Sequence, residues 1–340
     1  MNTHTLELLQ KLSAADAPSG AETPAASLCA YLLRPLTDEV RFDALGNVIA
    51  EKRCGKRGAK RVLLDAHIDE VGFIVTGRDG DFLRFDKVGG IDQRLLPAST
   101  VKILTEPPVY GVIDVLPPHV LKAGDSDKSQ KIDELRIDAG GADVDIGTPV
   151  VFASESYQPG DKLFVGKAMD DRACFASIIL ALEKLADVTL DCDVIVAGAV
   201  QEEVGTRGAY AAAYAADADF ALVCDVGFAE QPDVTKPEVT AKTGGGAIIS
   251  YCANADRALT KRIIAAANEK NIALQVFAEG GGDSGTDARA VQISRRGVKT
   301  AILGVPLRYM HTPSETVDAR DVETLAELIA EVLKGGVFNV

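Results

Sequence analysis

The spacing of apolar residues changes along the chain and divides it into three stretches. Near the start, leucines recur at helical spacing and predict helices over residues 5–13 and 23–34. From about residue 68 to 163, short apolar runs are separated by Gly and Pro, and no long helix is expected. This middle stretch is typical of a small β domain.

After about residue 164, helices alternate with strands of the buried type. The runs at 194–200 and 220–224 are almost wholly apolar, and helices are predicted over residues such as 172–185 and 257–269. Such alternation indicates a largely parallel sheet covered on both faces. We therefore predict an α/β fold, a three-layer α/β/α domain made of residues 1–67 and 164–340. Residues 68–163 would be inserted as a small β domain.

Composition and charge exclude two classes of partner. The 340 residues include 36 Lys and Arg against 50 Asp and Glu, which gives a net charge of −14. A nucleic-acid binder favours clustered basic residues, and the one dense basic run, residues 52–61, is predicted to be a solvated loop between two strands. No apolar stretch approaches the ~18 residues that a membrane span needs. We expect no nucleic acid and no membrane partner.

The six cysteines are scattered and form no C-x-x-C pair. In a chain of this length they are predicted to be reduced thiols that mostly pack in the core. The first residues lack a basic segment followed by an apolar core, so no secretory signal is visible. We expect a cytoplasmic protein.

His67 ends a predicted strand and is followed closely by Asp69. Residues two apart on a strand share a face, so Asp69 can accept the ring N–H of His67 that a metal does not use. Such a bond fixes the orientation of a ligating imidazole. A lone H-x-D pair fits a hydrogen-bonded structural histidine equally well.

Two adjacent acids, Asp170 and Asp171, stand just before a predicted helix. One of them could simply cap the helix, since Asp is favoured there. The second would remain free to bind a cation.

Acids also follow two apolar strands. Glu202 and Glu203 come directly after the strand at 194–200, and Asp225 follows the strand at 220–224. Carboxylates at the end of a buried strand are costly unless they are paired or bind a metal, and sites in α/β sheets gather at these strand ends. One of the two adjacent glutamates could bind a metal while the other addresses a bound water.

His311 lies on a loop after a further apolar strand. Together, two histidines and three carboxylates suit a pair of divalent ions, with Zn or Co as the natural candidates, and one Glu is left as a general base. The Gly-rich segment 279–287 lacks the lysine of a phosphate loop. It is predicted either to line a pocket or to join a strand to a helix.

Six segments together resemble the tetrahedral (glutamyl/leucyl-type) aminopeptidase family of dinuclear metallopeptidases. They are 67–72 (HIDEVG), 167–172 (KAMDDR), 201–205 (QEEVG), 224–226 (CDV), 281–288 (GGDSGTDA) and 309–315 (YMHTPSE). The resemblance runs from about Pro18 to the last helix. It implies a zinc-peptidase domain with a PDZ-like β-barrel insert used in dimerisation. It also implies action on short peptides and a homo-oligomer built from dimers, up to a dodecamer.

Position by position, the resemblance also implies roles for the site residues. Glu202 would be the general base and Asp69 would orient His67. Asp170 would bridge two metal ions, and its peptide bond to Asp171 would be cis. The remaining metal ligands would be His67, Glu203, Asp225 and His311.

Two other functions remain as alternatives to a metal-dependent aminopeptidase. A glycan hydrolase would use paired carboxylates facing each other across the sugar. A non-catalytic peptide-binding shell would be expected to have lost a ligand or the base, and the sequence retains them all. The preferred N-terminal residue of the substrate is left open, because an acidic one would need a Lys or Arg that the sequence does not identify.

Overall fold

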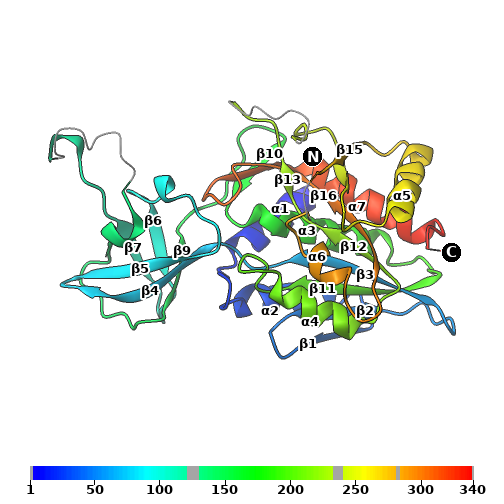
Figure 1. The fold of residues 1–340 in the computed structure, drawn as a ribbon, viewed down its shortest axis with the longest axis horizontal. Helices are drawn as coiled ribbons and strands as arrows, with labels where there is room; N and C mark the ends of the chain where they lie inside the picture. Colours follow the sequence, from blue (N-terminus) through cyan, green and yellow to red (C-terminus); the bar gives the residue numbers. More distant parts are fainter. Residues whose placement is uncertain (1–2, 121–129, 233–239, 281–283, 339–340) are drawn as a thin grey trace.

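The computed structural model describes residues 3–120, 130–232, 240–280 and 284–338. Figure 1 shows a mixed α/β unit beside a closed barrel of six strands. The barrel strands lie between Gly72 and Phe152, and the chain segments on both sides of them belong to the α/β unit. The predicted α/β/α fold with an inserted small β-barrel is confirmed.

An eight-stranded sheet forms the centre of the α/β unit. Its order is β1 (Glu39–Phe42), β2 (Val48–Lys52), β11 (Cys192–Ala199), β3 (Lys60–His67), β12 (Phe220–Cys224), β16 (Lys299–Gly304), β14 (Ala247–Tyr251) and β15 (Leu274–Ala278). The central strands β11, β3, β12 and β16 are parallel. Their carboxyl ends therefore lie at one edge, where His67 pairs with Ala199.

Alternate residues of each central strand face opposite layers, as the two-residue period of a strand requires. Leu64 and Val196 join the larger buried cluster, whereas their neighbours Leu63 and Ile195 join the smaller one. Strands that are buried on both faces explain why their sequences are almost wholly apolar.

Helices cover both faces of the sheet. The larger cluster contains residues of α1 (Thr3–Ala14), α2 (Thr23–Leu33), α3 (Met169–Lys184), α5 (Arg257–Lys270) and α7 (Ala319–Lys334). The smaller cluster contains residues of α4 (Arg207–Ala216) and α6 (Ala288–Val291).

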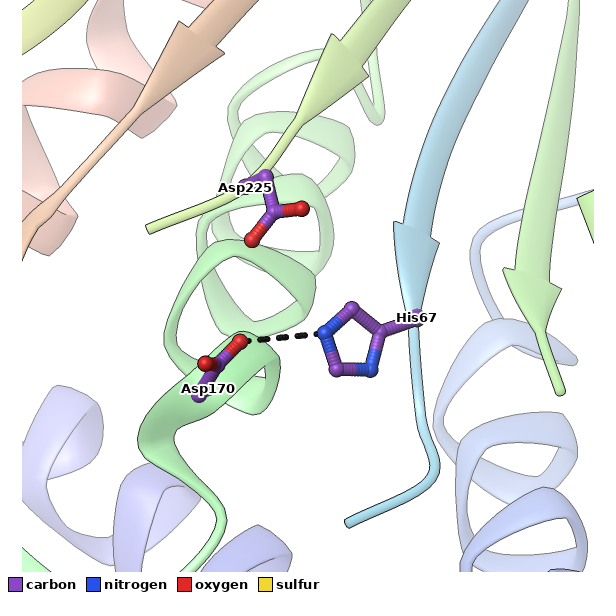
Figure 2. Close-up of side chains that lie close together, drawn as sticks. All are labelled: His67, Asp170 and Asp225. Atoms are coloured by element: carbon purple, nitrogen blue, oxygen red, sulfur yellow. Dashed lines mark hydrogen bonds and ion pairs between the residues drawn. The ribbon is translucent and has the colours of Figure 1, made fainter. Parts of the chain in front are cut away.

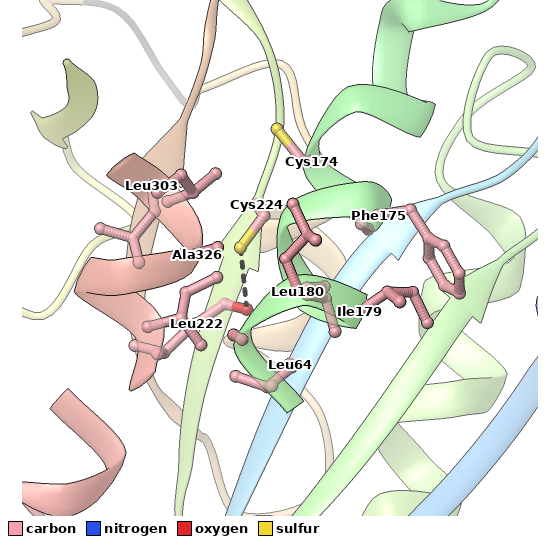
Figure 3. Packing of buried hydrophobic residues seen from close by; sticks show 14 of the residues in the cluster. Leu64, Cys174, Phe175, Ile179, Leu180, Leu222, Cys224, Leu303 and Ala326 are labelled. Atoms are coloured by element: carbon pink, nitrogen blue, oxygen red, sulfur yellow. Dashed lines mark hydrogen bonds between the residues drawn. The ribbon is translucent and has the colours of Figure 1, made fainter. Parts of the chain in front are cut away.

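The packing between α3, α7 and the sheet is shown in Figure 3. Leu64, Leu222 and Leu303 come from three neighbouring strands, and each is almost completely buried. Phe175 of α3 and Ala326 of α7 belong to the same cluster. This apolar layer fixes the start of α3 against the strand ends.

The barrel closes in the order β4 (Gly72–Asp79), β5 (Phe82–Val88), β8 (Ile137–Asp138), β7 (Val109–Ile113), β6 (Thr100–Ile103) and β9 (Pro149–Phe152). It has its own core, in which the ring of Phe73 meets Phe85 and Phe152 edge to face. Three short 3₁₀ helices lie in its connections: η1 (Gln93–Leu95), η2 (Pro118–Val120) and η3 (Ile132–Glu134).

A second, smaller sheet accounts for strands that the apolar pattern does not predict. It has the order β10 (Leu163–Gly166), β18 (Glu315–Asp318), β17 (Pro306–Arg308) and β13 (Gly227–Phe228). These strands are too short to show a periodic pattern. β14 is also unpredicted, because its five residues follow a Gly-rich turn and precede a polar segment.

The predictions about the basic run and the cysteines are confirmed. Residues 53–59 connect β2 to β3, and Arg53 forms ion pairs with Glu39 and Glu51. All six cysteines are free, and four of them are buried. Among the described residues, no helix combines the length and apolar character that crossing a membrane requires.

We expect Leu222→Ala to lower the free energy of unfolding by about 2–5 kcal/mol, because it leaves a cavity in the layer between β12 and α3. Leu45, which is 46 % exposed on a turn, provides the matched control. Leu45→Ala should change stability by less than about 0.5 kcal/mol. Chemical denaturation measures both, and similar costs for the two variants would contradict this description of the core.

Candidate metal centre

His67 occupies the last position of β3, at the carboxyl edge of the sheet, and is 2 % exposed. Its Nε2 lies 3.0 Å from Oδ1 of Asp170, and its Nδ1 lies 3.4 Å from Oδ1 of Asp69. Burial alone would lower the pKa of this imidazole. The two carboxylates outweigh burial and raise the pKa well above its usual value.

Asp170 stands between the two histidines at the start of α3. Its other oxygen, Oδ2, lies 3.2 Å from Nε2 of His311. The backbone at Asp170 and Asp171 is not helical, and their peptide bond is cis, as the resemblance implied. Regular helical geometry begins only after them, so the Asp170 side chain projects into the site instead of capping the helix.

Asp225 completes a first group of ligands. It follows β12 directly. Figure 2 shows its carboxylate above the carboxylate of Asp170 and the ring of His67, with the three side chains directed into one space. One potential ligand atom from each of the three residues lies within 4.8 Å of the others. Gly304 of β16 permits this arrangement, because a Cβ there would overlap the carbonyl oxygen of Asp225.

Glu203 and His311 form a second group with Asp170. Nε2 of His311 lies 3.3 Å from Oε2 of Glu203, and the three ligand atoms are again within 4.8 Å of one another. Nδ1 of His311 lies 2.6 Å from the carbonyl oxygen of Gly90. Gly90 follows β5, so the barrel insert helps to orient a side chain of the α/β unit.

Asp69 joins three parts of the chain at the site. Its Oδ1 lies 3.4 Å from Nδ1 of His67. It accepts hydrogen bonds from the backbone N–H groups of Glu202 and Glu203 at 3.0 and 3.2 Å, and from the hydroxyl of Ser19 at 2.6 Å. Burial raises the pKa of Asp69, but its donors outweigh burial and the net pKa is lowered. Asp69 therefore fixes both the imidazole and the turn that carries the two glutamates.

Glu202 lies beside this group, half-buried. Burial raises the pKa of its carboxyl, an effect that His67 partly opposes. The turn that presents it begins at Gln201, whose φ of 57° is left-handed. In the described structure, Glu202 belongs to neither group of potential metal ligands.

Glu315 is a supporting residue to which the sequence analysis gave no role. It is 2 % exposed and accepts hydrogen bonds from the backbone N–H of Asp170 at 3.0 Å and of His311 at 2.8 Å. Burial and the charge of Asp170 raise its pKa to about 8. The signal in the sequence for this role was an acid only four residues after His311, because a carboxylate that is buried there needs hydrogen-bond donors nearby.

A buried ion network was also missed. Glu70 accepts from Nζ of Lys167 at 2.7 Å and from the guanidinium of Arg172 at 3.3 Å, and all three residues are almost completely buried. Arg172 also donates to the carbonyl oxygen of Ile68 at 3.1 Å. The network thus connects the segment after His67 to the segment around Asp170. The signal for it in the sequence was that Lys167 and Arg172 flank the acid pair at 170–171.

The balance of charge at this edge favours cations. Burial together with the charge of Asp170 raises the pKa of Glu203 to about 9 and that of Asp225 well above its usual value. Buried carboxylates of this kind are normally paired or bind metal. Imidazole nitrogens and carboxylate oxygens are also the ligands that divalent zinc prefers. The donor set therefore fits two divalent ions that share Asp170.

Comparison with known proteins agrees with this chemistry. The profile of the M42 glutamyl aminopeptidase family matches residues 46–328. This chain belongs to that family. Lysyl aminopeptidase of Pyrococcus furiosus is 35 % identical over 344 residues, covering 96 % of this chain and 97 % of that protein. Membership of the M42 family makes the chain a hydrolase that acts on peptides.

Solved M42-like structures share the whole fold. An aminopeptidase from Desulfurococcus kamchatkensis superposes with a TM-score of 0.90 at 32 % identity, covering 98 % of this chain and 95 % of that one. The TET1 peptidase of Pyrococcus horikoshii, which assembles into a tetrahedron or a large octahedral shell, gives 0.84 at 32 % identity, with coverage of 97 % and 99 %. The similarity extends over both the α/β unit and the barrel.

We expect Asp69→Asn to weaken divalent-metal binding by about 10–100-fold, as loss of a group that orients a ligand usually does. The amide would present an N–H where Asp69 now accepts hydrogen bonds. Asp81→Asn, on an exposed turn of the barrel, is the matched control. Chelator competition measures both affinities, and an unchanged affinity in Asp69→Asn would contradict the role of Asp69.

Metal binding should release protons, and metal affinity should rise with pH. Without metal, burial raises the pKa of Glu203 to about 9. Burial alone would lower the pKa of His311, but Asp170 and Glu203 outweigh it and raise that pKa to about 9 as well. The pair formed by Glu203 and His311 therefore carries a proton at neutral pH, which it must lose to bind a metal. Calorimetry of the metal-free protein in buffers of different ionisation enthalpy measures this release. An affinity that stays constant from about pH 6 to 9 would contradict it.

Proposed function

We propose that this protein is a two-metal aminopeptidase that removes N-terminal residues from short peptides. The observation that carries the proposal is the pair of ligand groups that share Asp170, with Glu202 left outside both. Family membership supports the aminopeptidase activity. The ligand set that we propose is His67, Asp170 and Asp225 for one ion, and Asp170, Glu203 and His311 for the other.

Zn or Co are the ions that this mixture of imidazole and carboxylate favours. When bound, two such ions would polarise the scissile carbonyl and lower the pKa of the attacking water. The protein's part is to fix their ligands. Asp69 orients His67, and Glu315 holds the backbone of Asp170 and His311 in place.

Glu202 would act as the general base. It would accept a proton from the attacking water and then deliver it to the departing amine of the cleaved peptide. A free carboxylate beside the ligand groups, presented by a turn that Asp69 fixes, is suited to this transfer. The raised pKa of Glu202 brings it closer to neutrality, where one group can both take up and release a proton.

A glycan hydrolase is less well supported. Its two carboxyl groups would face each other across the sugar, at a separation of about 5–9.5 Å. Glu202 and Glu203 are adjacent in the chain, and Glu203 is already engaged with His311 at 3.3 Å. His67 and His311, which lie beside these acids, would have no part in that reaction.

We also propose that the protein forms a homo-oligomer built from dimers, up to a dodecamer. The similarity to a peptidase that assembles into tetrahedra supports this assembly. The apolar side chains Tyr110, Val112 and Ile146 are exposed on the barrel unit and would be available to a second subunit. Free cysteines are consistent with a cytoplasmic location.

The proposed function predicts that Glu202→Gln retains the fold and the bound metal but loses at least about 100-fold in turnover. Glu203→Gln is the matched comparison, because it changes the adjacent residue in the same way and should lose metal as well as activity. The assay is hydrolysis of aminoacyl chromogenic amides, after chelation and after adding back Zn, Co or Mn. Near-normal turnover in Glu202→Gln, or full activity in the presence of chelator, would refute the proposal.

A further inference from the structure

Two of the six cysteines lie opposite each other at the end of the central sheet that is far from the metal centre. Strands β2 and β11 are antiparallel, and their pairing ends with Lys52 opposite Val194. The same register, continued by two positions, places Cys54 opposite Cys192. The backbone N–H of Cys54 donates to Oδ1 of Asp193 at 2.9 Å, so the chain after β2 stays beside β11.

The two side chains point to the same face of the sheet. Residues two apart on a strand share a face, and Ala50 of β2 and Val194 of β11 both belong to the larger buried cluster. Cys192 is a member of that cluster, and Cys54 packs against it. Residues directly opposite each other on antiparallel strands have Cα atoms about 4.5–5.5 Å apart. That separation lies within the range that a disulfide bridges.

The two thiols differ in their access to solvent. Cys192 is 4 % exposed, and burial raises the pKa of its thiol to about 12, with a further contribution from the nearby Cys54. Cys54 is half-buried, and a cavity of about 190 Å³ beside it is also lined by Val188, Thr189 and Leu190. A small oxidant can therefore reach Cys54 first, whereas Cys192 is reached only from Cys54.

The other four cysteines are placed differently. Figure 3 shows Cys174 and Cys224 within the packed layer between α3 and the sheet, where both are almost completely buried. Cys29 is also completely buried, on α2. Cys252 is half-buried, but the register of β14 places Thr300 of β16 opposite it.

We propose that Cys54 and Cys192 form a reversible disulfide when the protein meets a peroxide, and that this bond staples β2 to β11. The Cys54 thiolate attacks one oxygen of hydrogen peroxide and breaks the O–O bond. Cys54 becomes a sulfenic acid, and the released hydroxide takes up the thiol proton to form water. The sulfur of Cys192 then attacks the sulfenic sulfur, and the departing hydroxide leaves as water with the proton of Cys192. Two thiols are thus oxidised to one disulfide, and one peroxide is reduced to two waters.

The disulfide acts on stability and not on the metal centre. Cys192 begins β11, and Ala199, which pairs with His67, ends it. At about 3.3 Å per residue, the bond is therefore roughly 23 Å from the end of the strand that lies beside the ligands. It joins segments that are far apart in the chain, and such a cross-link restricts the unfolded chain. Disulfides of cytoplasmic proteins are usually transient, which agrees with a reversible bond.

The experiment treats the zinc-loaded full chain with a small excess of hydrogen peroxide. The remaining thiols are blocked with N-ethylmaleimide in denaturant, and linked peptides are identified by mass spectrometry. We expect the loss of two of the six thiols and one linked pair of tryptic peptides, 54–56 with 185–207. Dithiothreitol should restore both thiols.

Variants test each cysteine separately. Cys54→Ser should keep all its thiols, and Cys192→Ala should stop at a sulfenic acid on Cys54, which dimedone traps. Cys252→Ser is the matched control, because it removes another half-buried cysteine and should form the same linked pair.

The melting temperature tests the effect of the bond. Oxidation should raise the Tm of the unsubstituted protein by about 5 °C and leave that of Cys54→Ser within about 1 °C. It should leave kcat/KM of the unsubstituted protein within about twofold, because the bond is distant from the metal centre.

The outcomes do not depend on the proposed function, because thiol counts and melting temperatures can be measured without turnover. Retention of both thiols in excess peroxide, or linkage of either cysteine to a different partner, would overturn the disulfide. An oxidised protein that melts no higher than the reduced one would overturn the staple. A loss of activity on oxidation that dithiothreitol reverses, and that Cys54→Ser does not show, would overturn the separation of this bond from the metal centre.

Discussion

The structure depends on how it accommodates several carboxylates at one edge of a buried sheet. Asp170, Glu203 and Asp225 converge there with His67 and His311, although they come from five separate segments of the chain. Taking such charges out of water is unfavourable unless they are paired or neutralised. Two shared cations would neutralise this cluster, and the geometry on both sides of Asp170 suits them.

The supporting residues explain how distant segments reach the same place. Asp69 connects the end of β3 to the turn after β11, and Glu315 connects the start of α3 to the loop of His311. Glu70 joins Lys167 and Arg172 in a buried network behind them. The carbonyl oxygen of Gly90 meets His311, so the barrel insert is part of the same construction. His67, Asp170, Glu203 and His311 are thus each held by a residue from another element.

Much of this could be predicted from the sequence, because its signals are strong where burial is complete. Apolar runs such as 220–224 predict central strands, and acids that follow them must meet at the sheet edge. The short strands β13, β17 and β18 carry too few residues to show a period. The supporting contacts of Glu70 and Glu315 depend on tertiary packing, which spacing along the chain does not reveal. Gly281, Gly282 and Asp283 of the Gly-rich segment lie outside the described residues, whereas Ser284 and Thr286 line a cavity of about 310 Å³ beside Asp225.

The central claim is that two ions share Asp170, and locating the metals in crystals tests it most directly. Anomalous X-ray scattering from metal-loaded crystals, recorded at the absorption edge of the added ion, would give their positions. The account predicts two peaks about 3.5–4 Å apart, one beside His67 and Asp225 and the other beside Glu203 and His311. A single peak, or peaks away from Asp170, would contradict it.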